Sequence, residues 1–203
     1  MERTLTTSQT LDDFRQRIRA RLAALGRVNG LLSRLNEGGR ISFDEFLRTE
    51  LKAHGVAGGE EDGSRVTLRG PARIPLRSAT VQTFALALHE LTTNALKHGV
   101  LSRPGGHLEV TWRLVPDPAA APRLQVEWTE TGVPVAEPDG VATDSAALPR
   151  KGYGRELIER ALPYQLKAQT SYEITPEGVR CTIIVPVSST LDVAFSSQGG
   201  TDD

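Results

Sequence analysis

A single stretch, residues 78–99 (SATVQTFALALHELTTNALKHG), constrains the fold of this 203-residue chain more than any other. Its mostly apolar positions recur at steps of three and four residues, the spacing of an amphipathic α-helix. These positions are Val81, Phe84, Ala85, Leu88, Leu91, Thr92 and Ala95. Because successive residues turn by about 100°, Glu90, Asn94 and Lys97 fall together on the opposite side. The stretch predicts a helix with one buried face, ending at Gly99 as a C-terminal cap.

The polar side of this helix carries a carboxylate, a carboxamide and an ammonium group in one line. A carboxamide oxygen suits a hard cation such as Mg²⁺, and an ammonium group suits phosphate. The same pattern also fits an amphipathic helix whose outer face is only solvated. The stretch alone leaves both interpretations open.

Composition excludes several classes of protein. Hydrophobic residues make up 38% and charged residues 24%, and the formal net charge of -1 encodes no overall attraction to nucleic acid or membrane. The lone cysteine, Cys181, excludes a disulfide framework and a cysteine-based zinc site, and favours a reducing compartment. No signal peptide and no apolar run of about 18 residues is present. We therefore expect a cytoplasmic protein without a nucleic-acid or membrane partner.

The segment before residue 40 has a narrow apolar seam with the spacing of a coiled coil. The seam consists of Leu11, Phe14, Ile18, Leu22, Leu25, Val28, Leu32 and Leu35. A seam this narrow packs against another helix rather than a sheet. It predicts a long helix over 11–35, with a possible homodimer through it. A capping box from Ser42 to Glu45 then predicts a short second helix that ends near Gly55.

Alternating apolar residues predict the strands of a sheet. They cover 65–69, 108–114, 124–128, 171–175 and 179–187, with 116–122 as a hairpin loop. Residues 133–151 show no periodicity and are predicted to be a mobile loop, while the Ser- and Gly-rich residues 188–203 are predicted to be a disordered tail. A further helix opens at Gly152. This order predicts an α+β fold with helices on one face of a mixed, mostly antiparallel sheet.

Four clusters carry the chemistry: 89–99 (HELTTNALKHG), 128–132 (WTETG), the loop 133–151, and 152–157 (GYGREL). Taken singly they are weak. A Gly-x-Gly before a helix can present backbone N–H groups to a phosphate, but it is equally a plain turn. Glu130 alone is as well explained as a surface charge. A Rossmann site is excluded, because the third glycine of its fingerprint is missing.

In their order and spacing, the four clusters resemble the nucleotide-binding domain of the GHKL superfamily, which includes histidine kinases, gyrase and chaperone ATPases. HELTTNALKHG is similar to the N box, WTETG to the first glycine box and KGYGREL to the second. His89, Trp128 and Glu130 resemble the markers of the HWE subgroup of bacterial sensor histidine kinases; the wider superfamily has Asp in place of Glu130. Residues 11–34 resemble the second helix of that subgroup's dimerisation hairpin, and the resemblance extends from 11 to 186.

The resemblance implies a two-layer α/β sandwich of the GHKL (Bergerat) type that binds ATP and Mg²⁺, preceded by the long hairpin helix. It implies catalytic roles for Glu90, which would polarise or position the accepting imidazole, and for Asn94, which would coordinate Mg²⁺. Glu130 would accept a hydrogen bond from the adenine amino group, and 133–151 would be the lid. The implied ATP-binding residues are Asn94, Lys97, His98, Glu130, Gly132, Gly152 and Gly154.

Kinases of this kind carry the phospho-accepting histidine on the first helix of the hairpin, ahead of position 11. The four histidines of this chain, His54, His89, His98 and His107, do not resemble an acceptor. We therefore expect the acceptor outside this chain, and no autophosphorylation on the usual site. The expected units are a partial dimerisation and phosphotransfer segment (1–55), an ATP-binding catalytic domain (56–187) and a tail (188–203).

The expected function is that of the catalytic domain of a two-component sensor histidine kinase. It would transfer the γ-phosphoryl group of ATP to a histidine that this chain lacks, and its partners would be a response regulator and the sensory domain of a parent protein. One alternative is a kinase-like scaffold or phosphotransfer adaptor that no longer uses ATP. Another is a free-standing ATP hydrolase with Glu90 as the base. Retention of the motif residues weighs against the scaffold; these are Glu90, Asn94, Glu130, Gly152 and Gly154.

Overall fold

The computed structural model describes residues 41–56, 64–117, 120–132 and 153–187, together with positions 15, 18, 19, 22, 23, 26, 27, 29 and 30. The predictions for the loop 133–151, Gly152 and the tail 188–203 lie outside the described residues. The elements are α3 (Phe43–Ala53), β1 (Val66–Arg69), α4 (Ser78–Lys97), the 3₁₀ turn η1 (Val100–Ser102), β2 (His107–Asp117), β3 (Ala120–Thr131), α5 (Tyr153–Glu156), the π-helical turn η2 (Leu157–Ala161), α6 (Leu162–Leu166), β4 (Gln169–Thr175) and β5 (Gly178–Pro186).

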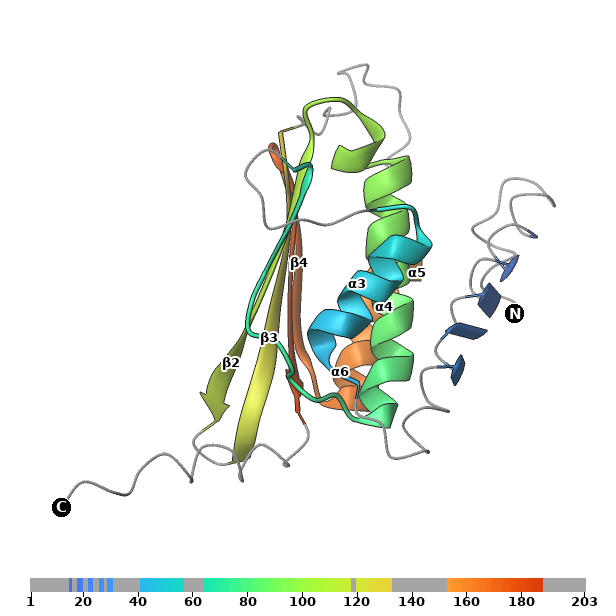
Figure 1. The fold of residues 1–203 in the computed structure, drawn as a ribbon. Coiled ribbons are helices and arrows are strands. Elements are labelled where there is room, and N and C mark those ends of the chain that lie inside the picture. Colours follow the sequence, from blue (N-terminus) through green and yellow to red (C-terminus); the bar gives the residue numbers. More distant parts are fainter. Residues whose placement is uncertain are drawn as a thin grey trace, which may run out of the picture.

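The described strands form one five-stranded sheet in the order β1-β2-β3-β5-β4. The β1–β2 pair is parallel and the other pairs are antiparallel. Helices α3, α4, α5 and α6 stack on one side of this sheet (Figure 1). The predicted α+β class and the mostly antiparallel sheet are confirmed.

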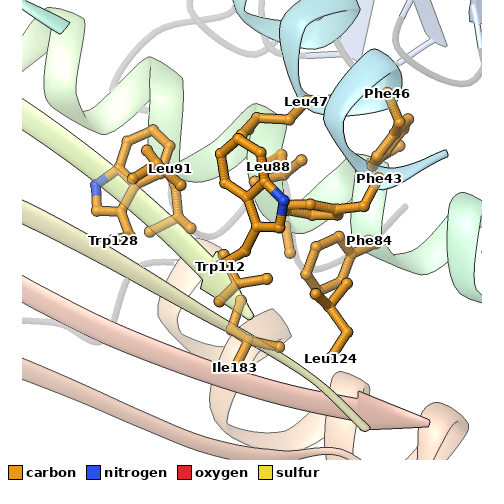
Figure 2. Close-up of a cluster of buried hydrophobic side chains, with 14 of the residues drawn as sticks. Phe43, Phe46, Leu47, Phe84, Leu88, Leu91, Trp112, Leu124, Trp128 and Ile183 are labelled. Atoms are coloured by element: carbon orange, nitrogen blue, oxygen red, sulfur yellow. The ribbon is translucent and has the colours of Figure 1, made fainter. Parts of the chain in front are cut away.

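The core lies between the sheet and the helices (Figure 2). All seven predicted positions of the α4 stripe are at most 1% exposed, so the predicted buried face of this helix is confirmed. Phe43 of α3 contacts Phe84 of α4 edge-on, with ring centroids 5.8 Å apart, and Trp112 of β2 at 5.4 Å. The side chains of α3 therefore share one core with the sheet and with α4.

The beginning of α3 and the approach to α4 are held together by backbone contacts. The N–H of Phe43 donates to the carbonyl of Ile74, and the N–H of Leu76 donates to that of Ile41. Ser42 is the N-cap, as the capping box predicts, but its hydroxyl donates to the Glu45 carboxylate at 2.9 Å rather than accepting a backbone N–H. The sequence therefore located the start of the helix correctly, with a different hydrogen bond.

The hairpin between β2 and β3 differs from its prediction. Strand β2 continues to Asp117 and β3 begins at Ala120, so most of the predicted loop 116–122 is strand. The register shifts between Val115 and Asp117, and this irregularity accommodates Pro116, which has no N–H to donate to a ladder. The loop prediction was wrong because proline and alanine at a strand end resemble a turn in composition.

The described positions of the N-terminal segment are helical, in agreement with the predicted long helix. Leu22, which belongs to the predicted seam, is 61% exposed. On another side of this segment, Arg27 reaches α3, where its guanidinium donates to the two carboxylate oxygens of Glu50 at 3.4 and 3.1 Å. None of the helices in the described part of the chain is long and apolar enough to cross a membrane.

Candidate functional site

The polar face of α4 meets the start of α5. Glu90 and Asn94 are half-buried there, while Lys97 and His98 at the end of the helix are exposed. A Cβ atom on Gly154 would lie 2.9 Å from the Glu90 Cβ, 3.2 Å from its Oε2 and 3.4 Å from the Asn94 Nδ2. The fold thus brings two residues of the first cluster against the second glycine of the fourth. The predicted approach of Gly154 to a nucleotide stays a prediction.

This close approach makes Gly154→Ala a direct test of the packing. The new methyl group has no room beside the Glu90 Cβ, which cannot rotate away, so α4 and α5 must separate slightly. We expect a loss of about 1–2 kcal/mol in the free energy of unfolding, measured with urea. The control is Gly30→Ala, where an added Cβ meets nothing within 4 Å. Equal stability of the two variants would contradict this packing.

Glu130 lies next to the C-terminal end of the same helix, beside Gly99 and Val100. It is close to the end of β3 and only 3% exposed. The indole N–H of Trp128 donates to its Oε1 at 3.0 Å, and the backbone N–H of Val100 donates to its Oε2 at 3.3 Å. Burial raises the pKa of this carboxyl above its ordinary value, and the two hydrogen bonds act in the opposite direction. The contact with Val100 joins the 128–132 cluster to the residue that follows the 89–99 cluster.

Gly99 is required for that junction. The predicted glycine cap is not left-handed: α4 ends at Lys97, His98 caps it, and Gly99 has an extended φ of -100°. A Cβ on Gly99 would overlap the Glu130 Oε2 and lie 2.8 Å from the Ala95 Cα. Space beside the carboxylate, rather than helix termination, therefore explains the glycine.

Gly132 follows β3 with a φ of +89°, a conformation that favours glycine. A Cβ there would also come within 2.5 Å of the Gly105 carbonyl oxygen. The chain's own packing is thus enough to explain this glycine. Its predicted approach to a nucleotide stays a prediction, as does that of Gly152, which lies outside the described residues.

Arg155 of the fourth cluster contacts Tyr172, a residue that the sequence analysis did not single out. The Arg155 guanidinium lies over the Tyr172 ring, 5.5 Å from its centroid, and Arg155 Nε donates to Glu159 at 2.6 Å. The pKa of Tyr172 is raised to about 12, first by burial and then by the nearby Glu130 carboxylate. Tyr172 lies in a predicted strand and pairs with Cys181, which in turn pairs with Trp128. Its position in that alternating strand was the sequence signal that could have identified Tyr172.

His89 lies next to Glu90 in the sequence, but its side chain faces α3. Its Nδ1 is 3.0 Å from the Nε2 of His54, the C-cap residue of α3, and the two ring centroids are 4.8 Å apart. The pKa of His54 is lowered to about 4 by burial, and further by His89 and Arg27. His89, one of the three subgroup markers, therefore connects two helices on the side of the N-terminal segment.

The lowered pKa of His54 predicts acid sensitivity. The unfolded histidine titrates near 6.5 and the folded one near 4, so between these values the unfolded state binds more protons. Stability is therefore full above pH 6.5 and falls as the pH drops toward 4, by about 1 kcal/mol once solvent screening of this half-buried ring is allowed for. Urea unfolding at pH 7.5, 6.5, 5.5 and 4.5 measures this. His54→Gln should flatten the profile, whereas the same change at exposed His98 should not; a His54→Gln profile as steep as the native one would refute the assignment.

Among the described residues, no group of three His, Cys, Asp or Glu side chains is arranged to hold a metal ion. A metal at this site would instead need the Asn94 carboxamide oxygen together with oxygens from a ligand, which is a coordination that Mg²⁺ accepts. The single carboxamide oxygen on α4 fits a cation that takes its other ligands from a phosphate group and water, rather than one enclosed by protein ligands.

The chain resembles known proteins at three levels. The sequence model of the HWE histidine kinase family matches residues 1–72. The blue-light-activated histidine kinase of Brucella ovis is 27% identical over 169 residues, which cover 83% of this chain and 31% of that protein. Its namesake in Rhizobium johnstonii is 28% identical over 169 residues, covering 83% and 43%. The structure of the Erythrobacter litoralis EL346 blue-light activated histidine kinase has a TM-score of 0.50, at 17% identity over 86% of this chain and 55% of that one.

The structural likeness shows the fold alone, which this chain shares with the Erythrobacter litoralis protein. The family match over 1–72 and the two relatives support the predicted resemblance to HWE histidine kinases. The markers His89, Trp128 and Glu130 lie outside the residues that the family model matches. The chain spans less than half of the length of the curated relatives it matches.

Proposed function

We propose that this chain is the ATP-binding catalytic part of an HWE-type sensor histidine kinase. One observation supports this most: three sequence clusters converge on α4, with Gly154 against Glu90 and Asn94, and Glu130 beside Gly99. The two glycines allow these close approaches, so Glu90, Asn94 and Glu130 all lie along the C-terminal half of α4. In the intact protein, the γ-phosphoryl group of ATP would pass to a histidine outside this chain, and then to a response regulator.

The roles proposed for the residues follow their placement. Asn94 would hold Mg²⁺, which bridges phosphate oxygens, and exposed Lys97 and His98 would approach the phosphates. Glu90, one turn before Asn94, would orient the accepting imidazole. Glu130 would accept the hydrogen bond of the adenine amino group, and 133–151 would act as the lid. Catalysis would come mainly from positioning and from neutralisation of phosphate charge.

The organisation of the chain is part of the proposal. The predicted division at residues 55 and 56 stays a prediction; because α3 lies in the common core, we place α3 with the nucleotide-binding unit. The helix predicted over 11–35 would join a partner helix of a parent protein or of a second copy. The lone, buried Cys181 suits a reducing compartment such as the cytoplasm.

The test is calorimetric titration of ATP into this chain, with and without Mg²⁺. Binding in the micromolar range that depends on the metal is the expected result. If it is found, joining an N-terminal helix that carries an acceptor histidine should give phosphohistidine from ATP. Absence of ATP binding by the folded protein would refute the proposal and favour the scaffold function.

A further inference from the structure

Trp128 is only 1% exposed, and the indole nitrogen, its one polar side-chain atom, has a hydrogen-bond partner. Its indole N–H donates to the Glu130 carboxylate at 3.0 Å. A Phe or Leu would fill a core position on this strand without any N–H to satisfy, so bulk alone does not explain the choice of tryptophan. A tryptophan at this position is explained if its indole N–H is needed to orient the Glu130 carboxylate.

The two residues are two apart on β3, so their side chains leave the same face of the sheet. Trp128 lies opposite Val110 and Cys181, and Glu130 lies opposite Leu108. The indole N–H and the Glu130 carboxylate meet along the strand at 3.0 Å. An aspartate is one methylene shorter, so its carboxylate would stay closer to the backbone and could not make this contact in the same geometry. Tryptophan and glutamate thus form one unit.

The second donor completes the orientation of the carboxylate. The backbone N–H of Val100 holds the other oxygen, Oε2, at 3.3 Å, and Gly99 leaves the space for it. A carboxylate has about four lone-pair sites, and these two bonds occupy one on each oxygen. The remaining acceptor sites have a fixed direction, because donors on two sides prevent the group from rotating.

We propose that Trp128 is the positioning residue for Glu130. Its indole N–H, together with the Val100 N–H, fixes the carboxylate in the orientation in which it accepts a hydrogen bond from the amino group of a 6-aminopurine. This inference rests on the proposed function for its ligand, but not for the hydrogen bond itself. It gives two of the three subgroup markers a shared role and accounts for the glutamate that replaces the superfamily's aspartate.

The charge state of Glu130 offers a readout that packing alone would not change. Tyr172 on β4 is close enough to Glu130 for the carboxylate to raise its pKa further, and Cys181 on β5 lies opposite Trp128. Burial is the main cause that raises the pKa of both groups to about 12, so neither ionises near neutral pH. Arg155 of α5 faces Tyr172. The indole hydrogen bond favours the carboxylate form; its removal therefore makes Glu130 take up a proton at higher pH.

The native protein allows a test without any loss of stability. In an NMR titration, the indole N–H resonance of Trp128 should move with the titration of the Glu130 carboxyl, which Glu130→Gln identifies. The indole of Trp112 is the internal control, because it is also buried and donates to the Pro71 carbonyl at 2.8 Å. A Trp128 resonance that ignores the titration of Glu130 would overturn the proposal.

The variants Trp128→Phe and Trp112→Phe form a matched pair, since each removes a buried indole and its N–H from the same face of the sheet. Only Trp128→Phe should raise the titration midpoint of Glu130, by about one pH unit. It should also reduce the preference for ATP over inosine triphosphate, which has an oxygen in place of the amino group, by about tenfold. A midpoint equal to that of Trp112→Phe would overturn the positioning role. A shifted midpoint in a protein that binds no ATP would instead refute the proposed function and leave the Trp128–Glu130 bond standing.

Discussion

Replacing Asn94 by alanine is expected to abolish Mg²⁺-dependent ATP binding while the protein stays folded. The residue lies on the half-buried polar face of α4, beside Gly154, and opposite the stripe that enters the core. Removing the carboxamide takes away the oxygen proposed for the metal and creates no cavity in the core. Loss of a metal ligand should weaken binding by about a hundredfold or more in the calorimetric titration.

The control for this variant is Gln82→Ala, an exposed position on the same helix, three turns before Asn94. It should bind Mg²⁺-ATP as the native chain does. Urea unfolding of Asn94→Ala within about 0.5 kcal/mol of the native protein would show that the fold is intact. Unchanged affinity in Asn94→Ala would refute the metal assignment, whatever the stability.

The fold could be predicted in large part because its main elements are strongly periodic. The α4 stripe repeats at helical spacing, and the inward residues of β2 and β3 alternate, so local sequence states which face is buried. The ends of the β2–β3 hairpin could not be predicted, because Pro116 indicates the end of a strand. Only the structure shows the register shift beside it, which lets the strand continue. The π-helical turn after α5 likewise has no periodic signal of its own.

The site divides in the same way. Glu90, Asn94 and Glu130 were found from motif order, and strand alternation already places Trp128 on the face of Glu130. The hydrogen bond between His54 and His89 joins residues 35 apart, and nothing in local spacing shows that α3 passes there. Gly99 was expected as a helix cap, whereas its neighbour across the fold sets the requirement. Pairings between distant elements are what the sequence leaves undetermined.

Arg27→Met is expected to have the largest effect on stability. Glu50 is fully buried on α3, and the Arg27 guanidinium donates to both of its carboxylate oxygens. A carboxylate left in the core without these donors costs several kcal/mol when fully enclosed; because Arg27 is itself 28% exposed, we expect about 2–3 kcal/mol in urea unfolding. Arg19→Met, at an exposed position of the same segment, should change stability by less than about 0.5 kcal/mol.

The double variant Arg27→Met with Glu50→Met separates the cost of an unpaired charge from the loss of packing. Replacing both partners by apolar side chains of similar size should recover most of the stability, since a buried ion pair contributes little beyond its own desolvation. The partners come from the N-terminal segment and from α3, whose C-cap His54 pairs with His89 of α4. If the pair fixes the N-terminal segment on α3, Arg27→Met should also speed proteolysis of that segment at neutral pH. Equal costs for Arg27→Met and Arg19→Met would show instead that the segment docks without this contact.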